Sequence, residues 1–201
     1  MGRPSRKDEL LAAGIEVLHR QGYAGSSVDA IVEHAGMQKG SFFGHFGSKE
    51  AFASEALNGY FKDWSAHAQA IMTNPALTSV EKLDGLIGIS TPARTDAFRY
   101  GCLIGNLAAE MATRHDEVRE TIARLLLEWA VPFAQLVREG VASGEFRPGL
   151  DPEPTARFLI NALQGTVLRG KIERSLEPYD DFVALALALL LNDASSASLR
   201  E

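Results

Sequence analysis

The fold of this chain is set by residues 26–50, SSVDAIVEHAGMQKGSFFGHFGSKE. Ser26 and Ser27 are residue types that cap helix N-termini, because their hydroxyls accept a hydrogen bond from an amide of the first turn. Apolar side chains then follow at steps of three and four, the spacing of one face of a short helix: Val28, Ile31, Val32 and Ala35. Gly36 is expected to end that helix.

A second short helix is predicted to begin at Met37 or Gln38. We expect its aromatic side chains to face inward and its polar ones to stay available to an outside partner: Phe42, Phe43 and Phe46 inward, and Gln38, Lys39, Ser41 and His45 outward. Residues 47–50, GSKE, end this helix and cap the next one. Two short helices joined by a tight glycine-containing turn form a helix-turn-helix, which places its second helix in the major groove of DNA.

Residues 22–52, GYAGSSVDAIVEHAGMQKGSFFGHFGSKEAF, resemble the N-terminal DNA-binding domain of the TetR/AcrR transcriptional regulators. The shared landmarks are the Gly-Tyr entry, the Ser-Val helix start, the Ala-Gly turn, the pairs Lys-Gly and His-Phe, and the triplet Ser-Lys-Glu. The likeness is strong over residues 5–60, and beyond them it is limited to a similar helical pattern. It implies an all-α fold, with an N-terminal three-helix DNA-binding domain and a larger C-terminal helical domain for ligand binding and dimerisation.

Composition and targeting signals indicate a globular protein of the cytoplasm. The chain has 201 residues, of which 46% are hydrophobic and 23% charged. Its first residues lack the apolar core of a signal peptide, and its most apolar late run, Phe182–Leu191, is about half as long as a membrane span of ~20 residues. One cysteine, Cys102, excludes an internal disulfide and a cysteine-built zinc site.

The charge is distributed unevenly for a DNA-binding protein. The net charge is −6, yet residues 1–62 contain seven basic and seven acidic side chains, so the whole deficit lies in residues 63–201. Attraction to phosphates must therefore come from local clustering, assisted by helix N-termini. The clustered cations are Arg3, Arg6, Lys7, Lys39 and Lys49.

The remaining pattern is helical throughout. Ser5 and Asp8 resemble a capping box that opens a first helix ending near Gly22, and a helix from Ser48 to about Met72 links the DNA-binding domain, residues 1–50, to the second domain, residues 51–192. Further helices are expected at 79–89, at 96–100 and at 118–144, where Pro132 should introduce a kink. Residues 193–201 are expected to be a disordered tail.

Two C-terminal helices are expected to pair between subunits. Nearly every residue of 182–191 is Ala, Val or Leu, and a helix that is apolar on all sides must be covered on more than one of them. The family resemblance implies a four-helix dimer interface made by two such helices from each subunit, for which residues 152–175 and 179–192 are the candidates. A homodimer is therefore predicted.

Candidate DNA contacts follow from the chemistry of the exposed groups. Gln38 can bond an adenine edge, Lys39 a guanine or a phosphate, and Ser41 either. Phe42 can touch a thymine methyl or belong to the core, while Phe43 stands where the family usually has a phosphate-bonding tyrosine and can only stack on the backbone. Phosphate contacts are predicted for Ser27, His45 and Lys49, and the short arm with Arg3 and Arg6 either lies over the minor groove or is a solvated tail.

Candidate effector-binding residues have the mixture of aromatic and polar groups typical of a small-molecule pocket, a mixture that also describes a core. They are Phe98, Tyr100, Cys102, Asn106, Trp129, Phe133 and Gln164, with Met111 and Phe158 as further candidates for the pocket wall. Cys102 is either a buried small side chain or a sensor thiol. The Gly-Cys-Leu run at 101–103 is similar to the reactive-cysteine region of the N-ethylmaleimide-responsive branch of the family.

The predicted function is that of a ligand-responsive or electrophile-responsive repressor, which binds a near-palindromic operator as a dimer and needs no cofactor. An enzyme is disfavoured because the sequence has no nucleophile elbow, no phosphate-binding glycine loop and no metal-spaced ligand cluster. The alternative left open is a helical small-molecule-binding or interaction module with weak or lost DNA binding. The inducer is a small molecule that the sequence does not identify.

Overall fold

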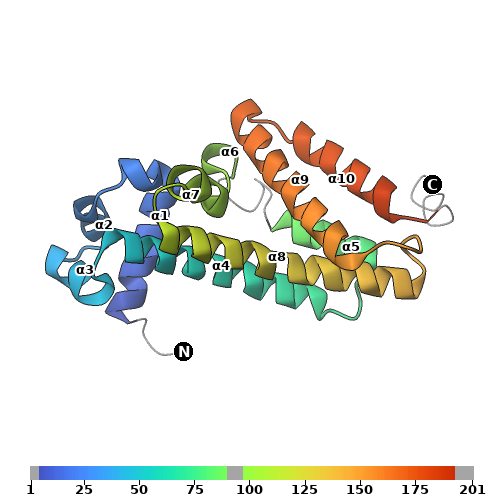
Figure 1. The fold of residues 1–201 in the computed structure, drawn as a ribbon, viewed down its shortest axis with the longest axis horizontal. Coiled ribbons are helices and arrows are strands. Elements are labelled where there is room, and N and C mark those ends of the chain that lie inside the picture. Colours follow the sequence, from blue (N-terminus) through green and yellow to red (C-terminus); the bar gives the residue numbers. More distant parts are fainter. Residues whose placement is uncertain (1–4, 90–96, 193–201) are drawn as a thin grey trace. The chain divides into compact units, whose positions relative to one another are not determined.

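The computed structural model describes residues 5–89 and 97–192, and these residues form an all-α fold, as predicted (Figure 1). The helices are α1 (Arg6–Gly25), α2 (Val28–His34), α3 (Lys39–Phe46), α4 (Lys49–Met72), α5 (Ser79–Gly88), α6 (Ala97–Tyr100), α7 (Leu103–Met111), α8 (Asp116–Ser143), α9 (Pro152–Glu173) and α10 (Glu177–Leu190). A single antiparallel bridge, between Phe146 and Leu191, is the β-type pairing found in the described ranges.

Contacts divide the chain into two compact units. The first comprises Met1–Asp63 and Cys102–Leu126, and the second comprises Trp64–Gly101 and Leu127–Glu201. The sequence-based boundary at residue 50 follows the helix-turn-helix alone. Contacts add α7 and the start of α8 to the N-terminal unit, because α7 packs against α1.

The first unit is built around helix caps and aromatic packing. Ser5 and Asp8 form the predicted capping box of α1, with the Asp8 amide 3.2 Å from the Ser5 hydroxyl and the Ser5 amide 3.1 Å from the Asp8 carboxylate. Gly14 allows α1 and α4 to approach closely, since a Cβ at this position would lie 2.2 Å from Cζ of Phe52. Phe42, Phe46 and Phe52 pack together at ring separations of 4.9–5.4 Å.

The second unit packs α5, α6, α9 and α10 with the ends of α4 and α8. In Figure 1, α9 and α10 run side by side. Gly170 permits their connection to fold back closely, because a Cβ there would lie 2.5 Å from the Tyr179 ring. Trp64 and Trp129 meet edge to face at 5.3 Å, and Pro132 lies within α8 as predicted.

Two carboxylates of α8 and its C-terminal turn hold α5 in place. Glu145 accepts hydrogen bonds from both the amide and the hydroxyl of Ser79, each at 2.9 Å. Lys82 donates to Glu139 at 2.9 Å, and this lysine is largely covered. These bonds fix the start of α5 against α8 within the second unit.

Replacing Glu139 with glutamine is expected to lower the free energy of unfolding near pH 7 and to reduce its loss in acid. The hydrogen bonds from Lys82 and Gln135 hold the pKa of Glu139 below its ordinary value of 4.5. A carboxyl with a lowered folded-state pKa stabilises the protein above its unfolded pKa, and that contribution is lost as the pH falls through the folded one. Since Glu139 is partly exposed, the expected loss is about 0.5–1 kcal/mol.

Urea unfolding of the wild type and of Glu139→Gln at pH 7 and at pH 3.5, followed by circular dichroism, measures this difference. The two curves should differ more at pH 7 than at pH 3.5. Asp84→Asn, at an exposed carboxylate of α5, serves as the control and should leave the curves unchanged. A difference for Glu139→Gln that is larger in acid contradicts the assignment.

Candidate nucleic-acid interface

The helix-turn-helix has the serine caps expected from the sequence, while α3 begins at Lys39 and Gln38, one of the two predicted starts, is its N-cap. The Ser27 hydroxyl accepts the Ala30 amide at 3.0 Å and opens α2, and the Ser48 hydroxyl accepts the Ala51 amide at 3.0 Å and opens α4. Gly36 (φ 64°) forms the turn after α2, and Gly47 (φ 72°) ends α3. Both glycines adopt the left-handed region that side chains disfavour, so the corner between α2 and α3 depends on them.

Helix α3 presents one buried face and one exposed face. Phe42 and Phe46, four residues apart, are buried, whereas a run of other side chains is exposed: Gln38 at the N-cap, Lys39, Phe43 and His45. Ser41 is half-buried. The helix thus offers polar and aromatic groups to a partner while two aromatic rings fix it to the core.

The prediction that Phe43 faces inward is wrong, because its side chain is 47% exposed. Phe42 and Phe46 share a face at i and i+4, and Phe43 is rotated by about 100° from Phe42, so the three rings cannot all face the core. Phe42, in contrast, is 0% exposed. It belongs to the core, and a thymine methyl is out of its reach in this conformation.

The basic side chains near α3 differ in what they bind. Lys39 pairs with Asp29 at 2.9 Å, and both side chains are largely exposed. Lys49 instead donates to the carbonyls of Tyr23 and Ser26, at 2.5 and 2.6 Å, and lies 4.2 Å above the Tyr23 ring. Burial lowers the pKa of Lys49. Its ammonium therefore caps the backbone between α1 and α2, and a phosphate contact would require it to leave those carbonyls.

The other predicted phosphate contacts lie at accessible positions. Ser27, His45 and Arg6 are exposed, and Ser27 keeps its hydroxyl proton for a further acceptor while its oxygen caps α2. Lys7, which was included in the basic cluster, pairs with Glu55 at 2.6 Å. Arg3, which belongs to the predicted minor-groove arm, lies outside the described residues.

Cys102 is the N-cap residue of α7 and is 8% exposed. The buried hydroxyl of Tyr60 donates a hydrogen bond to the Cys102 thiol and accepts one from the Leu103 amide. Burial, followed by the neighbouring Cys102, raises the pKa of Tyr60 far above its ordinary value. Tyr60 therefore stays protonated and remains a donor to the sulfur, a role that no local sequence pattern indicates.

The predicted effector-binding residues are divided between the two units. Cys102 and half-buried Asn106 belong to the first, and Tyr100, Trp129, Phe133 and Gln164 belong to the second. Trp129 and Phe133 are buried in the core. Tyr100 and Gln164 are half-buried, and the Phe98 side chain is outside the described part of the chain. Neither unit alone brings all seven together.

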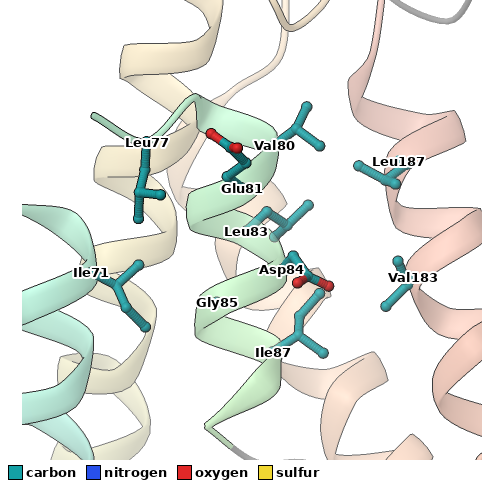
Figure 2. A pocket seen from close by; sticks show the side chains of 10 residues that line it. All are labelled: Ile71, Leu77, Val80, Glu81, Leu83, Asp84, Gly85, Ile87, Val183 and Leu187. Carbon is teal, nitrogen blue, oxygen red and sulfur yellow. The ribbon is translucent and has the colours of Figure 1, made fainter. Parts of the chain in front are cut away.

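Described residues of the second unit line two apolar grooves. One, of about 540 Å³, lies between α5 and α10, where Val183 and Leu187 point toward Val80, Leu83 and Ile87 (Figure 2). The other, of about 490 Å³, lies between α9 and α10 and is lined mainly by apolar side chains: Phe158, Leu159, Ala162, Pro178, Phe182, Leu185, Ala186 and Leu189. Among the candidate wall residues, Phe158 lines the groove between α9 and α10, and none of the seven effector-binding candidates lines either groove.

The structure offers no sign of a metal centre or a membrane span in the ranges it describes. Within residues 5–89 and 97–192, no three side chains of His, Cys, Asp or Glu gather closely enough to hold an ion. No helix among them is long and apolar enough to cross a bilayer.

Residues 10–56 match the model of a family described as "Bacterial regulatory proteins, tetR family", and residues 80–186 match "Tetracyclin repressor-like, C-terminal domain". The chain belongs to the TetR family. It is thus a DNA-binding transcriptional regulator, and the resemblance on which that prediction rested is confirmed.

Relatives of this TetR-family chain agree in length and fold. The HTH-type transcriptional repressor DhaR of Mycobacterium sp. (strain GP1) is 34% identical over 198 residues, which are 98% of each chain. A TetR regulatory protein from Rhodobacter sphaeroides has a crystal structure that is 30% identical, with a TM-score of 0.84 over 92% of this chain and 98% of that one. Reduced NemR of E. coli shares the fold (TM-score 0.83, 21% identity, 94% and 98% covered).

Proposed function

We propose that this TetR-family regulator is a ligand-responsive repressor that binds a near-palindromic operator as a homodimer. The observation that carries the proposal is the two-faced helix α3, which exposes Gln38, Lys39 and Phe43 while Phe42 and Phe46 hold it in the core. The name of the relative DhaR, a transcriptional repressor, supports repression as the outcome. Binding to chromosomal DNA places the protein in the cytoplasm, and no turnover of a substrate is part of its role.

On the operator, Gln38, Lys39 and Ser41 are positioned to contact base edges, and Ser27, His45 and Arg6 to contact phosphates. Phe43 supplies an apolar face to the sugar-phosphate backbone. To bind DNA, Lys39 must break its ion pair with Asp29. An exposed ion pair of this kind stabilises a protein by only about 0–1 kcal/mol, so the cost is small. Arg3 is proposed to follow the minor groove with the N-terminal arm.

A second copy of the chain is the proposed occupant of the groove between α9 and α10. Large apolar side chains are exposed along these helices and their connection, and water is a poor environment for so much adjoining apolar surface: Phe158, Leu168, Ile172, Leu176, Leu185 and Leu189. Two-fold symmetry allows the same surface of each subunit to cover the other. The resulting dimer presents two α3 helices to two half-sites.

The inducer acts by binding more tightly to a conformation in which the two α3 helices are displaced. A ligand with equal affinity for both conformations shifts nothing, whereas a preference of ~3 kcal/mol changes operator affinity on the order of 100-fold. Cys102 is the proposed site for an electrophilic effector. Its thiolate would add to the electrophile, and the Tyr60 hydroxyl, which donates to the sulfur, stabilises that thiolate.

Replacing Gln38 with alanine is expected to weaken operator binding by about 5–100-fold, because a bidentate contact to a base contributes about 1–3 kcal/mol. Base preference should relax at one position of each half-site. The slope of log K against log salt should stay unchanged, since no phosphate contact is lost. Gln69→Ala, at an exposed glutamine of α4, is the control and should bind as the wild type does.

The proposal is tested by fluorescence anisotropy of DNA taken from immediately upstream of the coding region, titrated at 50 and 200 mM salt with and without N-ethylmaleimide. Tight binding that weakens steeply with salt supports the repressor. Loss of binding on adding the electrophile, and its retention in Cys102→Ser, supports the sensor thiol. If binding ignores the electrophile, the effector is a reversible ligand, and if binding is absent or indifferent to salt, an interaction module without DNA binding is favoured.

A further inference from the structure

The backbone between α1 and α2 is held by opposite charges from two other helices. Gly22 (φ 71°, ψ 178°) breaks the helical conformation of α1, and the backbone runs through residues 23–26 to Ser27, the N-cap of α2. We name residues 22–26, which comprise the end of α1 from its break at Gly22 and the following Ser26, the α1–α2 turn. Lys49 of α4 binds its carbonyls at Tyr23 and Ser26, and the Ser26 hydroxyl donates to the Tyr23 carbonyl at 3.0 Å.

The amide side of the same turn is bound by Glu110 of α7. Its carboxylate accepts the Ala24 amide at 2.9 Å. Gly22 makes room for it, because a Cβ on Gly22 would lie 2.4 Å from Oε1 of Glu110. The charge of Glu110 also acts on the nearby Lys49 and favours its protonated form. The Lys49 ammonium thus donates hydrogen bonds to carbonyls of the turn, and the Glu110 carboxylate accepts a hydrogen bond from one of its amides.

Helix α7 connects this turn to the buried Tyr60 hydroxyl. Leu103, at the first turn of α7, donates its amide to Tyr60, and Glu110 lies seven residues later, about 10 Å along the helix. The helix packs on α1 over this distance. If α7 moves, the bond from Glu110 to the Ala24 amide therefore moves the backbone that leads into the Ser27 cap, α2 and α3.

We infer that Glu110 is a positioning residue for operator binding: by holding the Ala24 amide, it sets the helix-turn-helix in the orientation that fits DNA and couples that orientation to α7. The inference rests on the proposed DNA-binding function. It does not require Glu110 to touch DNA, and its carboxylate has the wrong charge to attract a phosphate.

Whether operator affinity falls or rises when Glu110 is replaced distinguishes a positioning role from a purely electrostatic one. Removing a carboxylate from a DNA-binding unit lessens its repulsion of phosphates and should tighten binding slightly. Positioning predicts the opposite. Glu110→Ala is expected to weaken operator binding about 10-fold, whereas Glu110→Gln, which loses the same charge but keeps an oxygen that can accept the Ala24 amide, should stay within about threefold of the wild type. Glu120→Ala, at an exposed carboxylate of α8 in the same unit, should bind at least as tightly as the wild type.

Anisotropy titration of the four proteins on one operator fragment gives these affinities, and hydrogen-deuterium exchange of the free proteins gives a readout that needs no DNA. Glu110→Ala should exchange at least 10-fold faster in residues 23–34, with exchange in α9 and α10 unchanged. Two results would overturn this inference and leave the proposed function standing, provided that the wild type binds DNA. One is unchanged hydrogen exchange in Glu110→Ala, and the other is a Glu110→Ala variant that binds DNA as tightly as Glu120→Ala. A wild type that binds no DNA at all overturns the proposed function, and the inference with it.

Discussion

Replacing Leu185 with arginine is expected to turn the proposed dimer into a monomer and to weaken operator binding by more than about 100-fold. Leu185 is 65% exposed and lines the groove between α9 and α10, where the second subunit is proposed to bind. A guanidinium at this position would have to lose water inside an interface lined mainly by apolar side chains, which is strongly unfavourable. A monomer then binds a half-site without the gain in effective concentration that the second α3 helix provides.

Sedimentation equilibrium measures the mass of the variant, and anisotropy measures its operator affinity. Gln69→Arg adds the same positive charge at an exposed polar position of α4, and it should remain dimeric and bind normally. A Leu185→Arg protein that sediments as a dimer contradicts the assignment of this groove to the second subunit.

Replacing Phe42 with alanine is expected to lower the free energy of unfolding by about 3–5 kcal/mol, because it opens a cavity in a core that relaxes only partly. Phe42 is 0% exposed, and its ring packs against Phe46 at 5.4 Å and Phe52 at 5.1 Å. These contacts join α3 to α4. Much of the operator affinity should be lost with them, since α3 is no longer held in one orientation.

Phe43→Ala provides a matched comparison at the next residue. Phe43 is exposed, so its truncation should change the free energy of unfolding by less than about 1 kcal/mol and should affect mainly DNA binding. Urea unfolding of both variants, followed by circular dichroism, measures the contrast. Equal losses of stability in the two variants contradict the division of α3 into a buried and an exposed face.

Local features of the helix-turn-helix are predictable from sequence because they depend on neighbouring residues. The hydroxyls of Ser27 and Ser48 each accept a hydrogen bond from the amide three residues later. Gly36 and Gly47 adopt positive φ angles, which a residue without a side chain adopts easily. Each of these interactions forms within one turn of helix. The orientation of Phe43 follows from the same geometry, once the start of α3 at Lys39 is known.

Features that join distant segments are not encoded in any local pattern. Lys49 is predicted to contact a phosphate because it is a cation near a helix N-terminus, whereas its binding to the Tyr23 carbonyl depends on how α4 packs against α1. Glu110 lies 86 residues from Ala24 along the chain, so the bond between them has no sequence signal. Trp129 and Phe133, which are predicted to bind an effector, are buried, and the sequence cannot tell a pocket wall from a core there because both use the same aromatic residues.

Selection of bound sequences from a random double-stranded DNA library tests most directly whether this protein is a dimeric, operator-specific regulator. The expected result is enrichment of one near-palindromic motif, bound by two subunits with an affinity that falls steeply between 50 and 200 mM salt. The Gln38→Ala variant should enrich a motif that is less defined at one position of each half-site. Recovery of no motif, or of one bound by a single subunit without dependence on salt, contradicts this account.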